Sequence, residues 1–203
     1  MSRWFRSYGF ADVFDDLIVG AYPLDQGDVD TLAHMGIDRV LNLTEDVEYR
    51  PGDREAVEHA LADAGIAESR LPLTDYGGLP AGELEAAVRA VGGWLDDGER
   101  TYLHCRAGWQ RSAAVAAGVV AIRAGIDIDE ALDHVRRRKP SADPLPHQRA
   151  DLRRWWESRQ VADDPGSRVA RRPDPRTVED DPGSRVAGEA GRDDAGGPGR
   201  DAG

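Results

Sequence analysis

Residues 101–112 read Thr-Tyr-Leu-His-Cys-Arg-Ala-Gly-Trp-Gln-Arg-Ser, a short apolar run that ends in a His-Cys pair. Five residues separate Cys105 from Arg111, and Ser112 follows directly. A segment of this length can curl around a tetrahedral anion with several N–H groups pointing inward, and a helix that begins at Ser112 would direct its positive end to the same point. Because a helix N-terminus or a neighbouring cation lowers the pKa of a cysteine, Cys105 is predicted to ionise and attack phosphorus at neutral pH.

The neighbours of Cys105 resemble a known signature loop. The matching residues are His104, Cys105, Gly108, Arg111 and Ser112. They resemble the loop of the cysteine-dependent protein tyrosine phosphatases, and the short chain is most similar to their dual-specificity branch. Segments 17–22, 36–44 and 71–75 resemble, in order, those that precede the loop in that branch, so that the resemblance covers about residues 12 to 158. A lone cysteine is usually a small buried hydrophobic residue, but these fixed offsets favour a phosphate-binding nucleophile.

The resemblance implies a reaction through a cysteinyl-phosphate and a role for each residue. Cys105 is implied to be the nucleophile, Arg111 the group that grips the phosphoryl oxygens, and Ser112 the hydroxyl that helps the thiolate leave. Asp75 falls where the family keeps its general acid. The physical chemistry agrees, since a guanidinium is a planar fork that holds two oxygens and a carboxylic acid can protonate a leaving oxygen.

The remaining site residues are less sharply defined. The phosphate-binding set is expected to comprise Arg106, Ala107, Gly108, Trp109, Gln110 and Arg111. Trp109 and Gln110 would point away from the anion, as a pocket wall or as simple packing, and Tyr76 would flank the substrate. His104 is expected to order the loop through hydrogen bonds. Asp75 precedes Tyr-Gly-Gly, where an aspartate is commonly just a turn residue. The other candidates for the acid are Glu45, Asp96 and Asp97.

Composition narrows the class of protein. The 203 residues hold 26 basic and 38 acidic side chains, for a formal charge of −12, which argues against binding of nucleic acid or an anionic membrane. A single cysteine forms no internal disulfide, which fits a reducing compartment. No apolar run is long enough for a signal peptide or a membrane span. We expect a monomeric cytoplasmic protein and, because its five histidines lack metal-ligand spacing, no metal or cofactor.

The pattern of apolar residues predicts the fold. Four short apolar runs are bounded by turn or polar residues, as buried strands are: 17–21, 39–43, 69–73 and 101–105. Between them, 57–64 and 84–95 show helical spacing. Strands interleaved with helices predict an α/β fold with a single central, mostly parallel sheet flanked by helices, similar to that of the phosphatases.

Three more helices are expected after the loop. Residues 113–124 are apolar almost all round, which predicts a helix buried against the sheet. Asp127 and Glu130 resemble a capping box, and the basic residues 136–139 suit the C-terminus of that helix before Pro140. A last helix is predicted over 145–159.

The composition changes near residue 160. Residues 161–203 contain no aromatic side chain and are dominated by Gly, Pro, Asp, Arg and Ala, so that they are predicted to be a disordered tail after a catalytic domain over 1–160. The sequence Asp-Asp-Pro-Gly-Ser-Arg-Val-Ala occurs at 163–170 and again at 180–187. A duplication in a solvated tail explains this repeat, and a linear binding motif remains an alternative.

These observations predict a phosphomonoester hydrolase that acts through a cysteinyl-phosphate. A phosphorylated protein is the leading substrate, with tyrosine or dual specificity, and a small phosphomonoester is the other. The alternatives are a phosphatase of inositol phosphates, lipids or RNA 5′ ends, and a phosphate-binding pseudophosphatase. A rhodanese-type sulfurtransferase is disfavoured, because its similar loops hold a shorter interval before the arginine.

Overall fold

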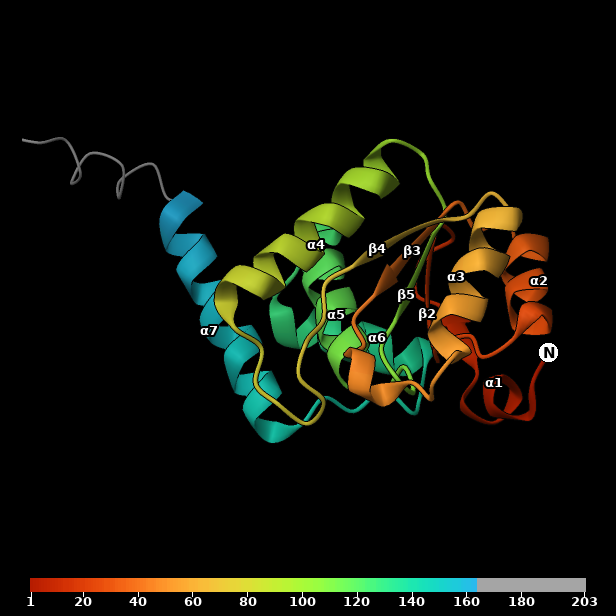
Figure 1. Cartoon of the computed structure of the whole chain (residues 1–203). Helices are drawn as coiled ribbons and strands as arrows, with labels where there is room; N and C mark the ends of the chain where they lie inside the picture. The colour runs from red at the N-terminus through yellow and green to blue at the C-terminus, as the bar shows by residue number, and fades with distance from the viewer. Residues whose placement is uncertain (164–203) are drawn as a thin grey trace, which may run out of the picture.

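The computed structural model describes residues 1–163, in which one five-stranded mixed sheet lies between two layers of helices (Figure 1). The strands are β1 (Phe10–Asp12), β2 (Leu17–Gly20), β3 (Arg39–Asn42), β4 (Ala67–Arg70) and β5 (Thr101–His104). Their order in the sheet is β1-β2-β5-β3-β4, with β1 antiparallel to β2 and the other neighbours parallel. The predicted α/β fold with a single, mostly parallel sheet is confirmed.

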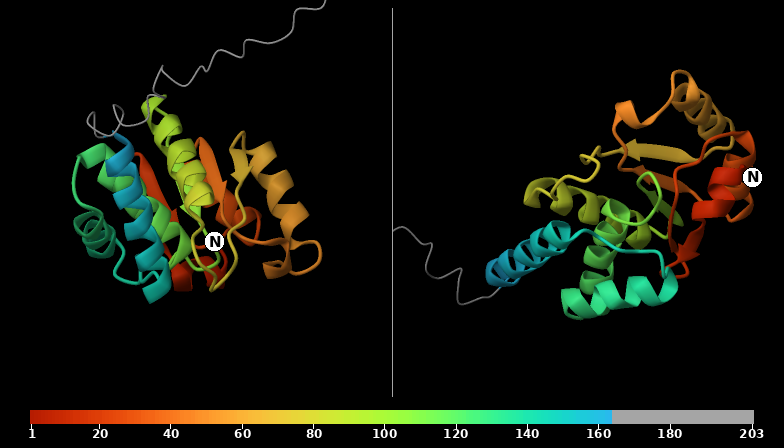
Figure 2. Two further views of the ribbon diagram at one scale, coloured as in Figure 1. Left: turned by 90° about the vertical axis from the view of Figure 1, so that its left-hand side faces the viewer. Right: turned by 90° about the horizontal axis from the view of Figure 1, so that it is seen from below.

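Helices cover both faces of the sheet. They are α1 (Arg3–Tyr8), α2 (Gln26–His34), α3 (Asp53–Asp63), α4 (Ala81–Asp96), α5 (Arg111–Ala124), α6 (Ile128–Arg138) and α7 (Pro146–Asp163). Side chains alternate between the two faces of a strand, so Ile18 of β2 joins the core under α1, α2 and α3, whereas Leu17 and Val19 join the core under α4 to α7. Figure 2 shows the strands between α3 on one side and α4 and α7 on the other.

The strand predicted over 69–73 begins and ends earlier in the structure. β4 pairs with β3 from Ala67 onward. It is an edge strand whose side chains are exposed or half-buried, so the apolar run does not mark it. Beyond β4, the N–H of Leu73 donates to the carbonyl of Leu43 at 3.0 Å, and segment 71–73 therefore still follows the end of β3.

Several other elements differ from what the sequence pattern predicts. α1, α2 and β1 have six, nine and three residues, which is too short for a periodic pattern to indicate them. Asp127 begins α6 as expected, but its carboxylate accepts the N–H of Asp129 and not that of Glu130. α7 continues to Asp163, three residues past the predicted domain boundary at 160. The rest of the predicted tail, 164–203, lies outside the described residues.

Packing around α5 predicts a contrast between two helical glycines. A Cβ on Gly118 would lie 2.7 Å from Val88 and 3.2 Å from the ring of Trp155, whereas one on Gly93 of α4 meets no atom of residues 1–163 within 4 Å. Gly118→Ala should therefore destabilise the protein by about 1–3 kcal/mol through overpacking. Gly93→Ala should stabilise it by about 0.5–1 kcal/mol, since alanine loses less entropy in a helix. Urea unfolding midpoints measure both, and a Gly118→Ala protein as stable as the parent would contradict this packing.

Candidate active site

The segment from Cys105 to Gln110 joins the carboxyl end of β5 to the first turn of α5, and is called the anion loop below. It is fixed by close backbone contact, since a Cβ on Gly108 would lie 2.5 Å from the carbonyl carbon of Gly20, and Gly108 has a φ of +73°. The N–H of Tyr22 also donates to the carbonyl of Arg106 at 3.1 Å. Only glycine fits at position 108, because both the space and the left-handed conformation exclude a side chain.

The thiol of Cys105 lies at the bottom of this loop and is 3% exposed. The hydroxyl of Ser112 donates to Sγ at 3.3 Å. Burial raises the pKa of the Cys105 thiol, but the charge of Arg111, the hydroxyl and N–H of Ser112, and the N–H of Gln110 together hold that pKa below its ordinary value. The arrangement favours the thiolate.

Arg111 is 1% exposed, and acceptors from Glu48 and Leu73 hold its guanidinium in place. Its Nη1 and Nη2 donate to the two carboxylate oxygens of Glu48 at 2.7 and 2.8 Å, and Nη1 also donates to the carbonyl of Leu73 at 2.7 Å. Burial lowers the pKa of Arg111, but Glu48, the Cys105 thiolate and Asp75 raise it above its usual value. Nε is buried without a partner within residues 1–163. The hydrogen-bonding capacity of this nitrogen is therefore unused within the described residues.

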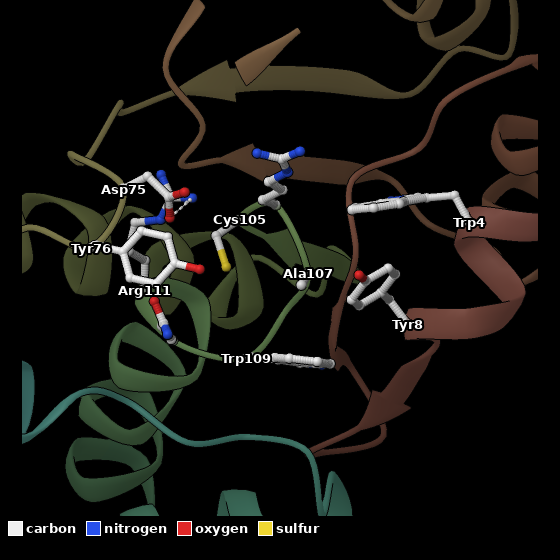
Figure 3. A pocket seen from close by; sticks show the side chains of 10 residues that line it. Trp4, Tyr8, Asp75, Tyr76, Cys105, Ala107, Trp109 and Arg111 are labelled. Carbon is white, nitrogen blue, oxygen red and sulfur yellow. Dashed lines mark ion pairs between the residues drawn. The ribbon is translucent and has the colours of Figure 1, made fainter. Parts of the chain in front are cut away.

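Asp75 lies beside Arg111, as Figure 3 shows, with Oδ1 2.9 Å from Nη2. It follows segment 71–73 and sits in a turn closed by the N–H of Gly77 and the carbonyl of Thr74 at 2.9 Å. Tyr76 occupies this turn with a φ of +57°, the one positive φ of a non-glycine residue in the described chain. Such a conformation is strained for a tyrosine, and strain of this kind gathers at functional sites.

His104 is buried at the end of β5, and its Nδ1 lies 3.2 Å from the carbonyl oxygen of Cys105. Burial, outweighing that hydrogen bond, lowers the pKa of His104 to about 3. The imidazole is therefore neutral near pH 7. A loop-ordering role for His104 stays a prediction.

The anion loop forms the floor of a pocket of about 300 Å³. Its lining residues are Trp4, Tyr8, Asp75, Tyr76, Cys105, Arg106, Ala107, Trp109, Gln110 and Arg111. Tyr76 stands on one side, and Trp109 with Tyr8 and Trp4 of α1 on the other (Figure 3). The rings of Tyr8 and Trp109 are 5.2 Å apart, and the guanidinium of Arg106 lies 5.9 Å from the ring of Trp4. The pocket thus combines a cationic floor with aromatic walls.

The structure separates the candidates for the acid. Asp75 lines the pocket, whereas Asp96 pairs with Arg123 at 2.7 Å and Asp97 caps the end of α4, so neither faces the pocket. Glu45 lies behind Asp75, where its Oε2 accepts the N–H of Asp75 at 3.0 Å.

The sequence interpretation missed Glu48 and the two residues of α1 that line the pocket. Glu48 ends a 3₁₀ turn, Asp46–Glu48, shortly after β3, and a cluster of acids after a buried strand was the available signal. Trp4 and Tyr8 carried no such signal, because only tertiary packing brings α1 to the anion loop.

Residues 1–163 contain no group of three or more acidic, histidine or cysteine side chains arranged to hold a metal ion. The same part of the chain has no helix that is both long and apolar enough to span a bilayer.

The model of a known family, "Dual specificity phosphatase, catalytic domain", matches residues 17–158. The chain belongs to this family. This dual-specificity phosphatase family member is a cysteine-dependent phosphatase, and its substrates are phosphorylated compounds. The resemblance seen in the sequence is thereby confirmed.

Individual relatives agree with this assignment. Human dual specificity phosphatase 28 is 29% identical over 146 residues, which cover 66% of this chain and 71% of the relative. The solved structure of Tk-PTP in its active form has a TM-score of 0.64 at 23% identity, over 73% of this chain and 96% of that one. PTPMT1 has a TM-score of 0.66 at 21% identity, over 76% and 98%. At these identities the two structures show a shared fold.

The surroundings of Cys105 predict how fast it is alkylated at each pH. Iodoacetate modifies the thiolate, so the rate at this single cysteine should rise with an inflection below that of an ordinary thiol. Ser112→Ala removes the hydroxyl that donates to Sγ and should move the inflection upward. Ser158→Ala, which removes a hydroxyl bonded to the carbonyl of Trp155, is the control. An inflection that is the same in all three proteins, measured by mass spectrometry, would contradict the proposed stabilisation.

Proposed function

We propose that this phosphatase dephosphorylates proteins, with Cys105 as nucleophile, Arg111 as phosphate ligand and Asp75 as general acid. One observation carries the proposal: three groups converge on a single pocket. They are a thiol with a lowered pKa, a guanidinium whose Nε has no partner within residues 1–163, and a carboxyl group. A nucleophile, an oxyanion clamp and an acid are the three groups that phosphomonoester cleavage requires.

In the first step, Sγ of Cys105 forms a bond to phosphorus, the bond from phosphorus to the leaving oxygen breaks, and Asp75 gives that oxygen its proton. Nε of Arg111 and the N–H groups of the anion loop bind the phosphoryl oxygens. A phosphoryl oxygen also replaces Asp75 on Nη2, which turns the carboxyl group toward the leaving oxygen. In the second step, water attacks phosphorus, Asp75 accepts its proton, and the S–P bond breaks with help from the Ser112 hydroxyl.

The walls of the pocket support an aromatic substrate side chain. Cys105 is 3% exposed, whereas Tyr76 and Trp109 at the rim are 69% and 40% exposed, so a phosphate must be carried inward past these rings. Flat rings stack favourably in such a slot. We therefore assign phosphotyrosine as the preferred substrate, with phosphoserine and phosphothreonine as poorer ones that reach the same loop.

A phosphatase of inositol phosphates or phospholipids is the second candidate, and Arg106 favours it. Its guanidinium lines the pocket beside Trp4, where it would bind a second phosphate. PTPMT1, which shares the fold, has been crystallised in complex with PI(5)P.

The role of Asp75 predicts a dependence on the leaving group. Asp75→Asn should lower kcat for phenyl phosphate by roughly 10²–10⁴-fold, because its phenolate leaving group needs a proton. It should change kcat/KM for 2,4-dinitrophenyl phosphate little, because that ratio reports formation of the cysteinyl-phosphate and this leaving group is stable as an anion. Cys105→Ser should abolish both reactions. Equal losses for the two esters would move the acid elsewhere, and activity retained in Cys105→Ser would overturn the proposal.

The pocket walls predict the order of substrates. Phosphotyrosine peptides should have a higher kcat/KM than matched phosphothreonine peptides and than inositol phosphates. Tyr76→Asn removes the ring, and because asparagine tolerates a positive φ, the turn is retained. This variant should reduce the preference for phosphotyrosine mainly through KM. Faster turnover of inositol phosphates by the parent protein, and its loss in Arg106→Ala, would instead establish the second candidate.

A further inference from the structure

The loop that carries Asp75 is held by α7, far along the chain. Asp151 Oδ2 accepts the N–H of Leu79 at 2.7 Å. Gln148 Nε2 donates to the carbonyl of Gly77 at 2.9 Å. Figure 1 shows the segment between β4 and α4 running past the N-terminal part of α7. His147 Nε2 also lies 3.0 Å from the carbonyl oxygen of Gly77, so three side chains of one helix contact the backbone just after the Asp75 turn.

The side chains of Gln148 and Asp151 are themselves fixed. Gln148 is fully buried, and its Oε1 accepts the N–H of Leu145 at 3.1 Å, so its amide bridges the start of α7 and the loop. The side chain of Asp151 is 16% exposed, and its other oxygen pairs with Arg154. Side chains that are locked by burial and by a second bond hold their partners in one position.

The loop needs this support because its own sequence does not fix it. Gly77 and Gly78 follow a turn in which Tyr76 has a strained positive φ. Glycine has the largest conformational freedom of any residue, and a strained turn persists only where its surroundings enforce it. Glu45 holds the near side of the turn through the N–H of Asp75, and α7 holds the far side.

Docking of α7 onto the domain is carried by other residues. Leu152 and Trp155 are buried in the core shared with α4 and α5, and Trp155 Nε1 donates to Glu85 at 2.9 Å. The polar bonds of Gln148 and Asp151 to the loop are therefore separate from the apolar surface that attaches the helix.

We propose that Asp151 and Gln148 are positioning residues that hold the carboxyl group of Asp75 at the leaving oxygen. The inference rests on the proposed function of Asp75 as general acid. It implies that α7 affects the two proton transfers of Asp75, and leaves the attack of Cys105 and the binding of phosphate to the anion loop.

The test compares one ester that needs the acid with one that does not. Asp151→Ala should lower kcat for phenyl phosphate by roughly 10- to 100-fold, the loss expected from a misplaced catalytic group. Its kcat/KM for 2,4-dinitrophenyl phosphate should stay near the parent value, because that ratio reports formation of the cysteinyl-phosphate and not its hydrolysis. Asp151→Asn keeps an oxygen acceptor for the N–H of Leu79 and should restore most of the rate. Gln148→Met, which keeps the volume and leaves only His147 on the carbonyl of Gly77, should lower kcat for phenyl phosphate in the same direction.

Asp127→Ala is the matched control, because the Asp127 carboxylate also accepts a backbone N–H, at 2.9 Å from Asp129, but at the start of α6. It should lower the urea midpoint to a similar extent and leave both activities unchanged. Equal losses for the two esters in Asp151→Ala and Gln148→Met would indicate general destabilisation and overturn the inference. Variants that hydrolyse phenyl phosphate at the parental rate would overturn it as well.

A double-mutant cycle separates this inference from the function on which it rests. If Asp151 acts through Asp75, then adding Asp151→Ala to Asp75→Asn should lower the phenyl phosphate rate no further, since the acid is already absent. Additive losses would contradict the positioning role. An Asp75→Asn protein with the parental leaving-group dependence would instead overturn the proposed acid itself.

Discussion

The buried ion pair between Arg111 and Glu48 is the interaction on which the site depends. Arginine stays charged in any protein environment, and a buried charge is tolerated only when it is paired and its donors are satisfied. Glu48 takes both Nη groups, and the carbonyls of Leu43 and Leu73 take the remaining bonds of Nη1. The same contacts therefore tie the ends of β3 and of segment 71–73 to the first turn of α5.

This pairing also determines which face of the guanidinium is left for a substrate. Glu48 accepts from both Nη groups, which leaves Nε without a partner in the described residues of a side chain that lines the pocket. Asp75 pairs with Nη2, so the acid and the arginine lie close to each other. Arg106 and Arg111 line the pocket of a chain with a formal charge of −12, so the proposed binding of an anion rests on local geometry and not on net charge.

The anion loop and the Asp75 turn are held in place in different ways. The contact between Gly20 and Gly108 and the apolar packing around α5 make the anion loop rigid. The Asp75 turn contains a strained tyrosine and two glycines, and it relies on Glu45 on one side and α7 on the other. Cys105 and Arg111, the proposed nucleophile and phosphate ligand, are thus built into the core, whereas Asp75, the proposed acid, sits in a turn that distant residues hold.

The sequence by itself determined the anion loop and the α/β fold. Cys105, Arg111 and Ser112 lie within eight residues, so the strand and the helix that flank them fix their relative positions locally. The tertiary structure decided the rest. Pairing with β3 determines where β4 begins, and the partner of Arg111 comes from a turn after β3. Part of the aromatic wall comes from α1, which no periodic pattern predicts. Asp75 was a candidate in the sequence, but its contact with Arg111 depends on chain segments 36 residues apart (111 − 75), and such long-range contacts are set by packing, which local patterns do not encode.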